Sequence, residues 1–185
     1  MFTTPFATIT SKTEKKLTLS LFYLLIIGAI VLVFFNNILE NNAAPYGIFS
    51  FELAGSLNKS LEILNSWSPL AKIFAGLSLG FDFLFLLIYT LFISLLIHKI
   101  NKRLWLGKPF HRIGELLVWS MCITAIFDAI ENAALIKLLV GSTQEYWSYI
   151  AYTFAVSKFI LISIAIIYII FNSAFLLFKK TSKIE

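Results

Sequence analysis

The sequence is poor in cysteine, histidine and charge. The single cysteine, Cys122, excludes an internal disulfide, a CxxC redox pair and a thiolate metal cluster. The two histidines, His98 and His111, fall in the basic segment between two long apolar runs. The sequence therefore predicts no multi-histidine metal or haem site inside a membrane, and no cofactor. Only 14% of the 185 residues are charged, which is low for a soluble domain.

Hydrophobic residues are abundant instead. They make up 59% of the chain, and phenylalanine alone occurs 19 times. A soluble domain of this size cannot bury that much apolar surface, so the excess must face lipid. The formal net charge of +5 is distributed as membrane topology requires, and no nucleic-acid partner is expected. We expect one membrane domain, all-α, over residues 1–185.

Four apolar stretches are long enough to cross the hydrocarbon core as helices, which takes about 20 residues. They predict a polytopic protein with four transmembrane helices at about 17–35, 70–97, 113–140 and 147–178. The first stretch is longer than the apolar region of a typical signal peptide, so we expect a retained anchor.

Lysine and arginine are distributed unevenly among the connections. They gather before the first span, between the second and third, and after the fourth, whereas the connection at 36–69 has only Lys59. Under the positive-inside rule, both termini and the central loop are cytoplasmic. The expected location is a cell membrane, and the inner membrane if the source is bacterial.

The outer connection at 36–69 contains two different segments. "PYGIFSFELAGS" (45–56) is expected to be extended, since Pro45 and Gly47 interrupt it. In contrast, 56–67 has hydrophobic residues at helical spacing and predicts a short amphipathic helix on the membrane surface. This helix is either a lid over the mouth of the bundle or a connector that covers helix ends.

Four ionisable residues lie well inside the spans: Asp82, Asp128, Glu131 and Lys158. Each costs roughly 2.5 to 3.5 kcal/mol on insertion scales, and such residues usually face the bundle interior. At about 1.5 Å per residue, all but Asp128 lie roughly 14 to 18 Å below the outer helix ends, and Asp128 is one turn deeper. They share one layer.

The neighbours of these charges on each helix are mainly small or polar, which is typical of helix–helix contacts in membranes. The polar stripes are therefore predicted to point into the bundle. Four neutral residues on these stripes could complete the hydrogen bonds of the layer: Ser78, Tyr89, Thr124 and Asn132.

Three carboxylates against one ammonium leave this layer with a formal charge of −2. Such a charge cannot remain uncompensated in a low-dielectric bundle. Either one or two carboxylic acids are protonated, or a cationic ligand or ion completes the site. A third interpretation is a polar staple that only holds the helices together.

Three segments carry a resemblance: "FELAGSLNKSLEILNSW" (51–67), "SLGFDFLFLLIY" (78–89) and "FDAIENAALIKLL" (127–139). Over about residues 50–165 the chain resembles an uncharacterised family of small bacterial four-helix integral membrane proteins with D-[FY]-x-F and D-x-x-E-N motifs. The resemblance implies that six residues form one constellation, but it implies no activity. For Glu52 this requires the outer loop to fold inward. The six are Glu52, Asp82, Asp128, Glu131, Asn132 and Lys158.

Three functions remain open on the sequence. The first is a pocket that binds or acts on a lipid or other amphiphile from the outer leaflet, with membrane lipids or an amphiphilic or cationic small molecule as partners. The second is transport of protons, cations or an amine by a homo-oligomer, although the inner half offers mainly Tyr89 and Asn172 and leaves an apolar plug. The third is an accessory subunit of a membrane complex. No nucleophile–base pair or cofactor motif identifies a reaction.

Overall fold

The chain is an all-α membrane protein. The computed structural model describes residues 3–181, and within that range it contains helices and no strand. Four of the helices are long and apolar enough to cross a membrane, which confirms the predicted multi-pass architecture. The helices are α1 (Ser11–Leu39), α2 (Ile48–Glu52), α3 (Leu57–Ser66), α4 (Pro69–Trp105), α5 (His111–Leu139) and α6 (Glu145–Thr181).

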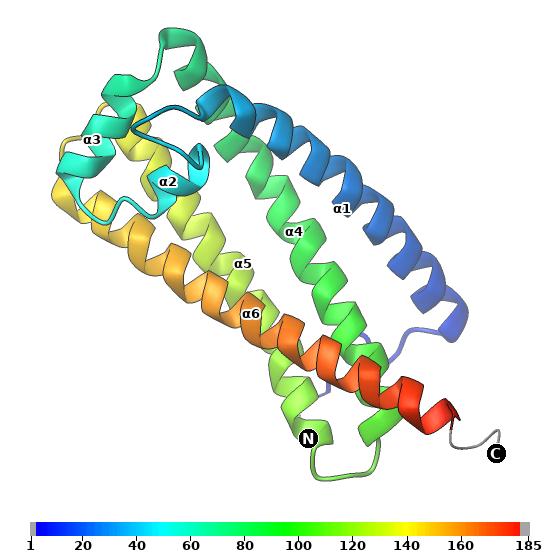
Figure 1. The fold of residues 1–185 in the computed structure, drawn as a ribbon. Coiled ribbons are helices and arrows are strands. Elements are labelled where there is room, and N and C mark those ends of the chain that lie inside the picture. The colour runs from blue at the N-terminus through cyan, green and yellow to red at the C-terminus, as the bar shows by residue number, and fades with distance from the viewer. Residues whose placement is uncertain (1–2, 182–185) are drawn as a thin grey trace.

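The four long helices form a bundle in which successive helices run in opposite directions (Figure 1). Helix α4 packs against α1, α5 and α6, and α5 and α6 pack against each other. The short helices α2 and α3 lie together at one end of the bundle, which we call the capped end. The α4–α5 connection lies at the opposite end, the basic end.

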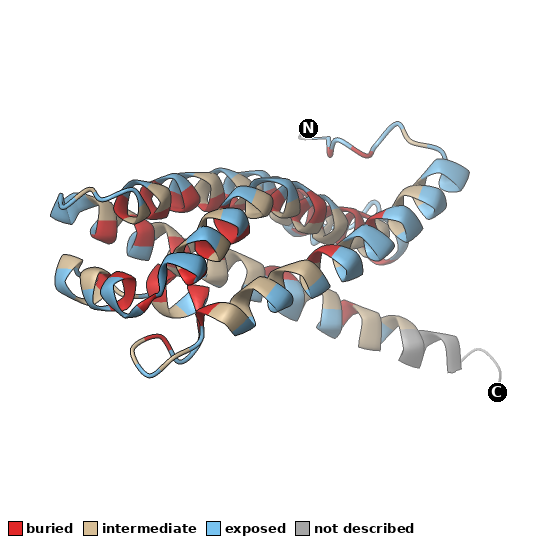
Figure 2. Ribbon diagram, turned by 90° about the horizontal axis from the view of Figure 1, so that it is seen from above, coloured by how far each residue is buried: buried red, intermediate tan, exposed pale blue. Residues whose placement is uncertain are grey.

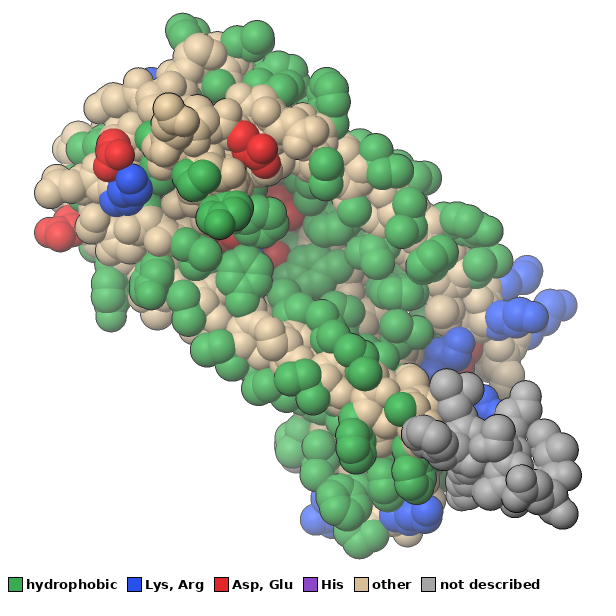
Figure 3. Space-filling view, viewed as in Figure 1, with side chains coloured by type: hydrophobic (Ala, Val, Ile, Leu, Met, Phe, Trp, Pro, Cys, Tyr) green, Lys and Arg blue, Asp and Glu red, His purple; other side chains and the backbone are tan. Residues whose placement is uncertain are grey.

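Buried residues follow the facing sides of the helices, and exposed residues follow their outer sides (Figure 2). Small residues such as Ala75 on α4 and Ala155 on α6 are fully buried, so the helices approach closely. Large aliphatic residues such as Ile30, Ile126 and Ile167 are exposed on the outside of the bundle. In Figure 3, hydrophobic side chains cover most of the visible face, while most Lys and Arg side chains lie toward the basic end.

Local sequence determines where several helices begin. The side chains of Thr10, Ser56 and Ser68 each accept a hydrogen bond from the backbone N–H three residues later, at the starts of α1, α3 and α4. These are N-caps, which satisfy N–H groups that the first helical turn leaves free. Pro69 has no backbone N–H, and at the first position of α4 this costs no helical hydrogen bond.

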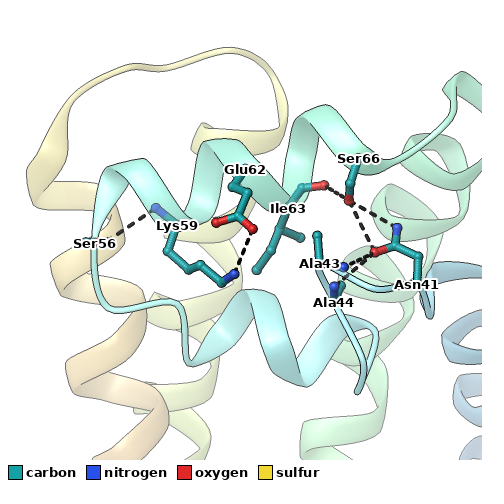
Figure 4. Close-up of polar contacts among 8 residues, drawn as sticks. All are labelled: Asn41, Ala43, Ala44, Ser56, Lys59, Glu62, Ile63 and Ser66. Carbon is teal, nitrogen blue, oxygen red and sulfur yellow. Dashed lines mark hydrogen bonds and ion pairs between the residues drawn. The ribbon is translucent and has the colours of Figure 1, made fainter.

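Helix α3, predicted at 56–67, is tied to the end of α1 by Asn41 (Figure 4). The Asn41 amide donates to the Ser66 hydroxyl at 3.0 Å, and its carbonyl oxygen accepts from the backbone N–H groups of Ala43 and Ala44 at 2.9 Å. Earlier on the same side of the helix, Lys59 pairs with Glu62 at 3.0 Å. The Asn41 side chain therefore both orders the turn after α1 and attaches that turn to the end of α3.

Hydrophobic contacts attach the cap to the bundle. The Trp67 indole N–H donates to the Leu39 carbonyl at 2.8 Å, and its ring meets Phe51 edge-on with centroids 5.4 Å apart. The Ser60 and Ser148 hydroxyls lie 3.0 Å apart and connect α3 to α6. Helices α2 and α3 are thus both packed against the end of the bundle.

The expectation of an extended segment at 45–56 was wrong, because Ile48–Glu52 forms helix α2. The Asn36 side-chain oxygen on α1 accepts a hydrogen bond from the Ile48 backbone N–H at 2.9 Å. A side chain of another helix therefore satisfies the first N–H group of α2. Ile48, Phe51 and Glu52 are buried. One helical turn is too short to show a 3.6-residue period, so the sequence pattern could not reveal it.

Gly47 is required by the approach of α2 to α1. Its φ is +56° and its ψ is −121°, and an added Cβ would collide with the Asn36 side chain. We expect Gly47→Ala to lower the free energy of unfolding by about 1–3 kcal/mol, through backbone strain and loss of the Asn36 contact. Thermal unfolding in detergent measures the change.

The matched control is Gly80→Ala, since an added Cβ at Gly80 meets nothing within 4 Å. Its melting temperature should stay level or rise, because alanine is the better helix former. Equal melting temperatures for the two variants would contradict the role assigned to Gly47.

The half of the bundle toward the basic end is more polar than the sequence suggested. His98 lies within α4, not in the loop, and its Nδ1 is 2.8 Å from the Thr4 hydroxyl. Asn101 donates to the His111 carbonyl at 2.9 Å and accepts from the Tyr168 hydroxyl at 3.1 Å. The expectation that this half offers mainly Tyr89 and Asn172 was therefore wrong.

Candidate functional site

The ionisable residues of the predicted layer meet at one place in the bundle. Asp82 comes from α4, Asp128 and Glu131 from α5, and Lys158 from α6. Glu52 joins them from α2. We call these five residues the carboxylate–lysine cluster. The one-turn spacing of the two acids on α5 brings both onto the side that faces α6.

Lys158 is at the centre of the cluster. Its Nζ lies 2.6 Å from Asp128 Oδ1 and 2.8 Å from Glu131 Oε2. All three side chains are buried, and Glu131 has no exposed surface. Two short contacts to carboxylate oxygens hold the amine as an ammonium, so Lys158 is not available as a nucleophile.

Neutral side chains complete part of the cluster. The Tyr89 hydroxyl donates to Asp128 Oδ2 at 2.7 Å, so Asp128 has a partner on each oxygen. The Asn132 amide donates to Asp82 Oδ2 at 2.6 Å. These bonds connect α4 with α5 in the same layer as the Lys158 contacts between α5 and α6.

Glu52 reaches the cluster because its loop folds inward. Only 7% of Glu52 is exposed, and its Oε2 lies 3.7 Å from Lys158 Nζ. Burial raises the pKa of the Glu52 carboxyl, whereas the Lys158 ammonium opposes that rise. The sequence could place Glu52 here only through the family resemblance.

Two of the neutral residues on the predicted stripes make no hydrogen bond to the cluster. The Thr124 hydroxyl donates to the Ser120 carbonyl of its own helix at 3.0 Å, so the expectation that it completes the layer was wrong. A threonine in a helix can satisfy its hydroxyl in this way without any tertiary partner. Ser78 is buried and lines the cavity described next, and it makes no side-chain hydrogen bond among the residues the structure describes.

The charge imbalance is larger than the sequence indicated. With Glu52 included, four carboxyl groups and one ammonium leave a formal charge of −3. Neither Glu131 oxygen has a hydrogen bond of good geometry, although one of them is in contact with Lys158. Protons or a bound cation must therefore compensate the cluster.

A cavity of about 530 Å³ opens onto the cluster. Residues of α1, α2, α4, α5 and α6 line it. Figure 1 shows how these helices are arranged. Figure 3 shows the hollow on this face, with hydrophobic side chains around it and acidic side chains at its bottom. The cavity therefore has an apolar wall and a charged floor. Its floor includes Glu52, Asp82, Tyr89, Asp128, Asn132 and Lys158.

Sequence reasoning missed the α1 side of this cavity. Asn36, Asn37 and Glu40 line it near the capped end, and Asn36 also donates to Glu40 at 2.8 Å. A polar run directly after an apolar span ordinarily marks the membrane interface. Its only unusual feature is that Asn36 and Asn37 are adjacent amides, and this alone could not locate a cavity.

No protein-family model, curated protein or solved structure matches this chain. The resemblance to the four-helix family stays a prediction, and the function must be argued from the site.

Proposed function

We propose that this protein binds a lipid or other amphiphile in the cavity between α1 and α6. The cavity with an apolar wall and a charged floor is the observation that carries the proposal. Its volume of about 530 Å³ is within the range of small-molecule sites. Membrane lipids and amphiphilic small molecules are the matching partners.

The direction of entry supports an amphiphile over a water-soluble ligand. Val33 and Phe49 line the cavity and are strongly exposed at its edge, on the hydrophobic outside of the bundle. A hydrocarbon chain could lie there against similar side chains, while a polar head group reaches the cluster. At the capped end, Asn37 and Glu40 line the cavity and are exposed, so a water-soluble molecule could reach it there but would leave this apolar edge uncovered.

We infer that the capped end faces outward from the cytoplasm and that both termini are cytoplasmic, in a cell membrane. Lys102 and Arg103 near the end of α4 and Arg112 at the start of α5 lie at the basic end. This distribution follows the positive-inside rule. The ligand then enters from the outer leaflet, beneath α2 and α3.

Transport is less well supported by the same geometry. Below the cluster, the hydroxyls of Thr90 and Ser94 donate to backbone carbonyls, and Leu95 and Met121 are fully buried between the helices. These residues form an apolar barrier between the cluster and the polar groups at the basic end. A proton or ion path would need water or titratable groups at this level.

Native mass spectrometry of protein extracted with its own lipids tests the proposal. We expect a discrete bound mass on the wild type and at least a tenfold smaller bound fraction on Asp128→Asn, because that substitution changes the floor of the cavity. Glu145 is an exposed acid at the start of α6, so Glu145→Gln is the matched control and should keep the mass.

Asp128→Asn also removes a partner of Lys158 and could reduce folding. Ala29→Phe provides a second test, since Ala29 lines the cavity from α1 and is not part of the cluster. It should exclude the same mass by filling space. A wild type without any bound mass, or one whose bound mass survives both substitutions, would contradict the proposal.

A further inference from the structure

The floor of the cavity has an acid that Lys158 does not neutralise. Lys158 is in contact with Asp128, Glu131 and Glu52, whereas Asp82 is not among its ion-pair partners. The polar partner of Asp82 in the described structure is the neutral Asn132 amide, on Oδ2. Asp82 is only partly buried and lines the cavity, so it faces the space that a ligand would fill.

Glu52 adds a second unsatisfied group on the floor of the cavity. It lines the cavity, it is more than nine-tenths buried, and its Oε2 has no hydrogen bond. Its contact with the Lys158 ammonium is long, at 3.7 Å, because Asp128 and Glu131 hold that group more closely. A buried carboxyl oxygen without a donor is costly, and a ligand that brings N–H groups would satisfy it once the Glu52 side chain turns this shielded oxygen toward the cavity.

Aromatic rings surround the same space. Phe85 and Tyr89 from α4 lie with ring centroids 5.8 Å apart, and Phe49 from α2 and Phe159 from α6 lie 6.3 Å apart. All four line the cavity. The Lys158 ammonium already lies 5.1 Å from the Phe159 ring centroid. Aromatic faces together with carboxylates are the surroundings in which proteins hold organic ammonium groups.

Other head-group chemistries fit less well. Among the described residues that line the cavity, Lys158 is the one basic side chain, and its contacts with carboxylates leave it unavailable to a phosphate or carboxylate ligand. Such an anion would also meet the acidic floor. Among the described residues, no group of three or more His, Cys, Asp or Glu is placed to hold a metal ion.

We propose that the amphiphile carries a protonated amine, which Asp82 binds as its counter-ion and Glu52 contacts as a second acceptor. The inference rests on the proposed binding function and names the class of its ligand. The amine supplies one positive charge beside Asp82, while its hydrocarbon chain lies along the apolar wall between α1 and α6.

The test compares probes of equal chain length on the purified full-length protein in a neutral maltoside detergent. Dodecylamine, dodecanol and dodecyl phosphate are added at the same mole fraction, and native mass spectrometry measures the bound fraction of each. We expect at least tenfold more bound dodecylamine than dodecanol or dodecyl phosphate. Asp82→Asn should lower dodecylamine binding about tenfold and leave dodecanol binding unchanged, and Glu145→Gln should change neither.

The outcomes separate the two proposals. Equal binding of dodecanol and dodecylamine, with both excluded by Ala29→Phe, would overturn the amine inference and leave the pocket in place. If no probe binds and no native mass is present, the binding function itself fails. Amine binding that is unchanged in folded Asp82→Asn would overturn the role of Asp82. The comparison of probes on the wild type decides the head-group class even if that variant does not fold.

Discussion

Lys158→Met is expected to lower the free energy of unfolding by about 3–5 kcal/mol, the range for removing one partner of a buried charge pair. Methionine keeps much of the length of the lysine side chain but leaves Asp128 and Glu131 without the ammonium that lies 2.6 and 2.8 Å from them. Both acids would then be buried next to each other, with Glu52 close by. Thermal unfolding and the yield of monodisperse protein in detergent measure the loss.

Two further variants show whether charge is the cause. Lys137→Met is the matched control, because Lys137 is exposed near the end of α5, and it should leave the melting temperature within a few degrees of the wild type. Neutralising the acids in the triple variant Lys158→Met, Asp128→Asn, Glu131→Gln should restore part of the lost stability. If Lys158→Met alone is as stable as Lys137→Met, the cluster is neutral in the folded protein and our charge assignment is wrong.

Trp67→Ala should have an effect of similar size, about 3–5 kcal/mol, since it empties a large buried site. Trp67 is only 3% exposed, packs edge-on against Phe51, and donates to the Leu39 carbonyl. Loss of the indole would detach α2 and α3 from the bundle. We therefore expect faster hydrogen exchange across residues 41–66 than in the wild type, together with weaker retention of any bound amphiphile.

Trp67→Phe is the control for this prediction. It keeps an aromatic ring against Phe51 but removes the hydrogen bond to Leu39 and part of the indole volume, so a loss of about 1–2 kcal/mol is expected, smaller than for Trp67→Ala. Protection of residues 41–66 should remain close to that of the wild type. An unchanged exchange rate in Trp67→Ala would mean that the cap is held by other contacts, such as Ser60 with Ser148.

The sequence alone determined the helical membrane architecture and the polar layer. The four spans followed from length and apolarity, which are properties of each segment by itself. The inward direction of Asp82, Asp128 and Lys158 followed from the fixed rotation of 100° per residue in a helix. Because a helix is locally regular, the spacing of Asp128 and Glu131 was enough to place both on one side.

Only the tertiary structure decided which groups complete the site. Thr124 could bond across the bundle or to its own helix, and residue spacing does not distinguish the two. Glu52 reaches Lys158 because Gly47 permits a tight approach of α2 to Asn36, a contact between segments that are separated along the chain. The cavity exists because α1 packs against α4 while α6 packs against both α4 and α5, which leaves space between α1 and α6. Such contacts depend on how whole helices fit together, and local periodicity carries no information about that fit.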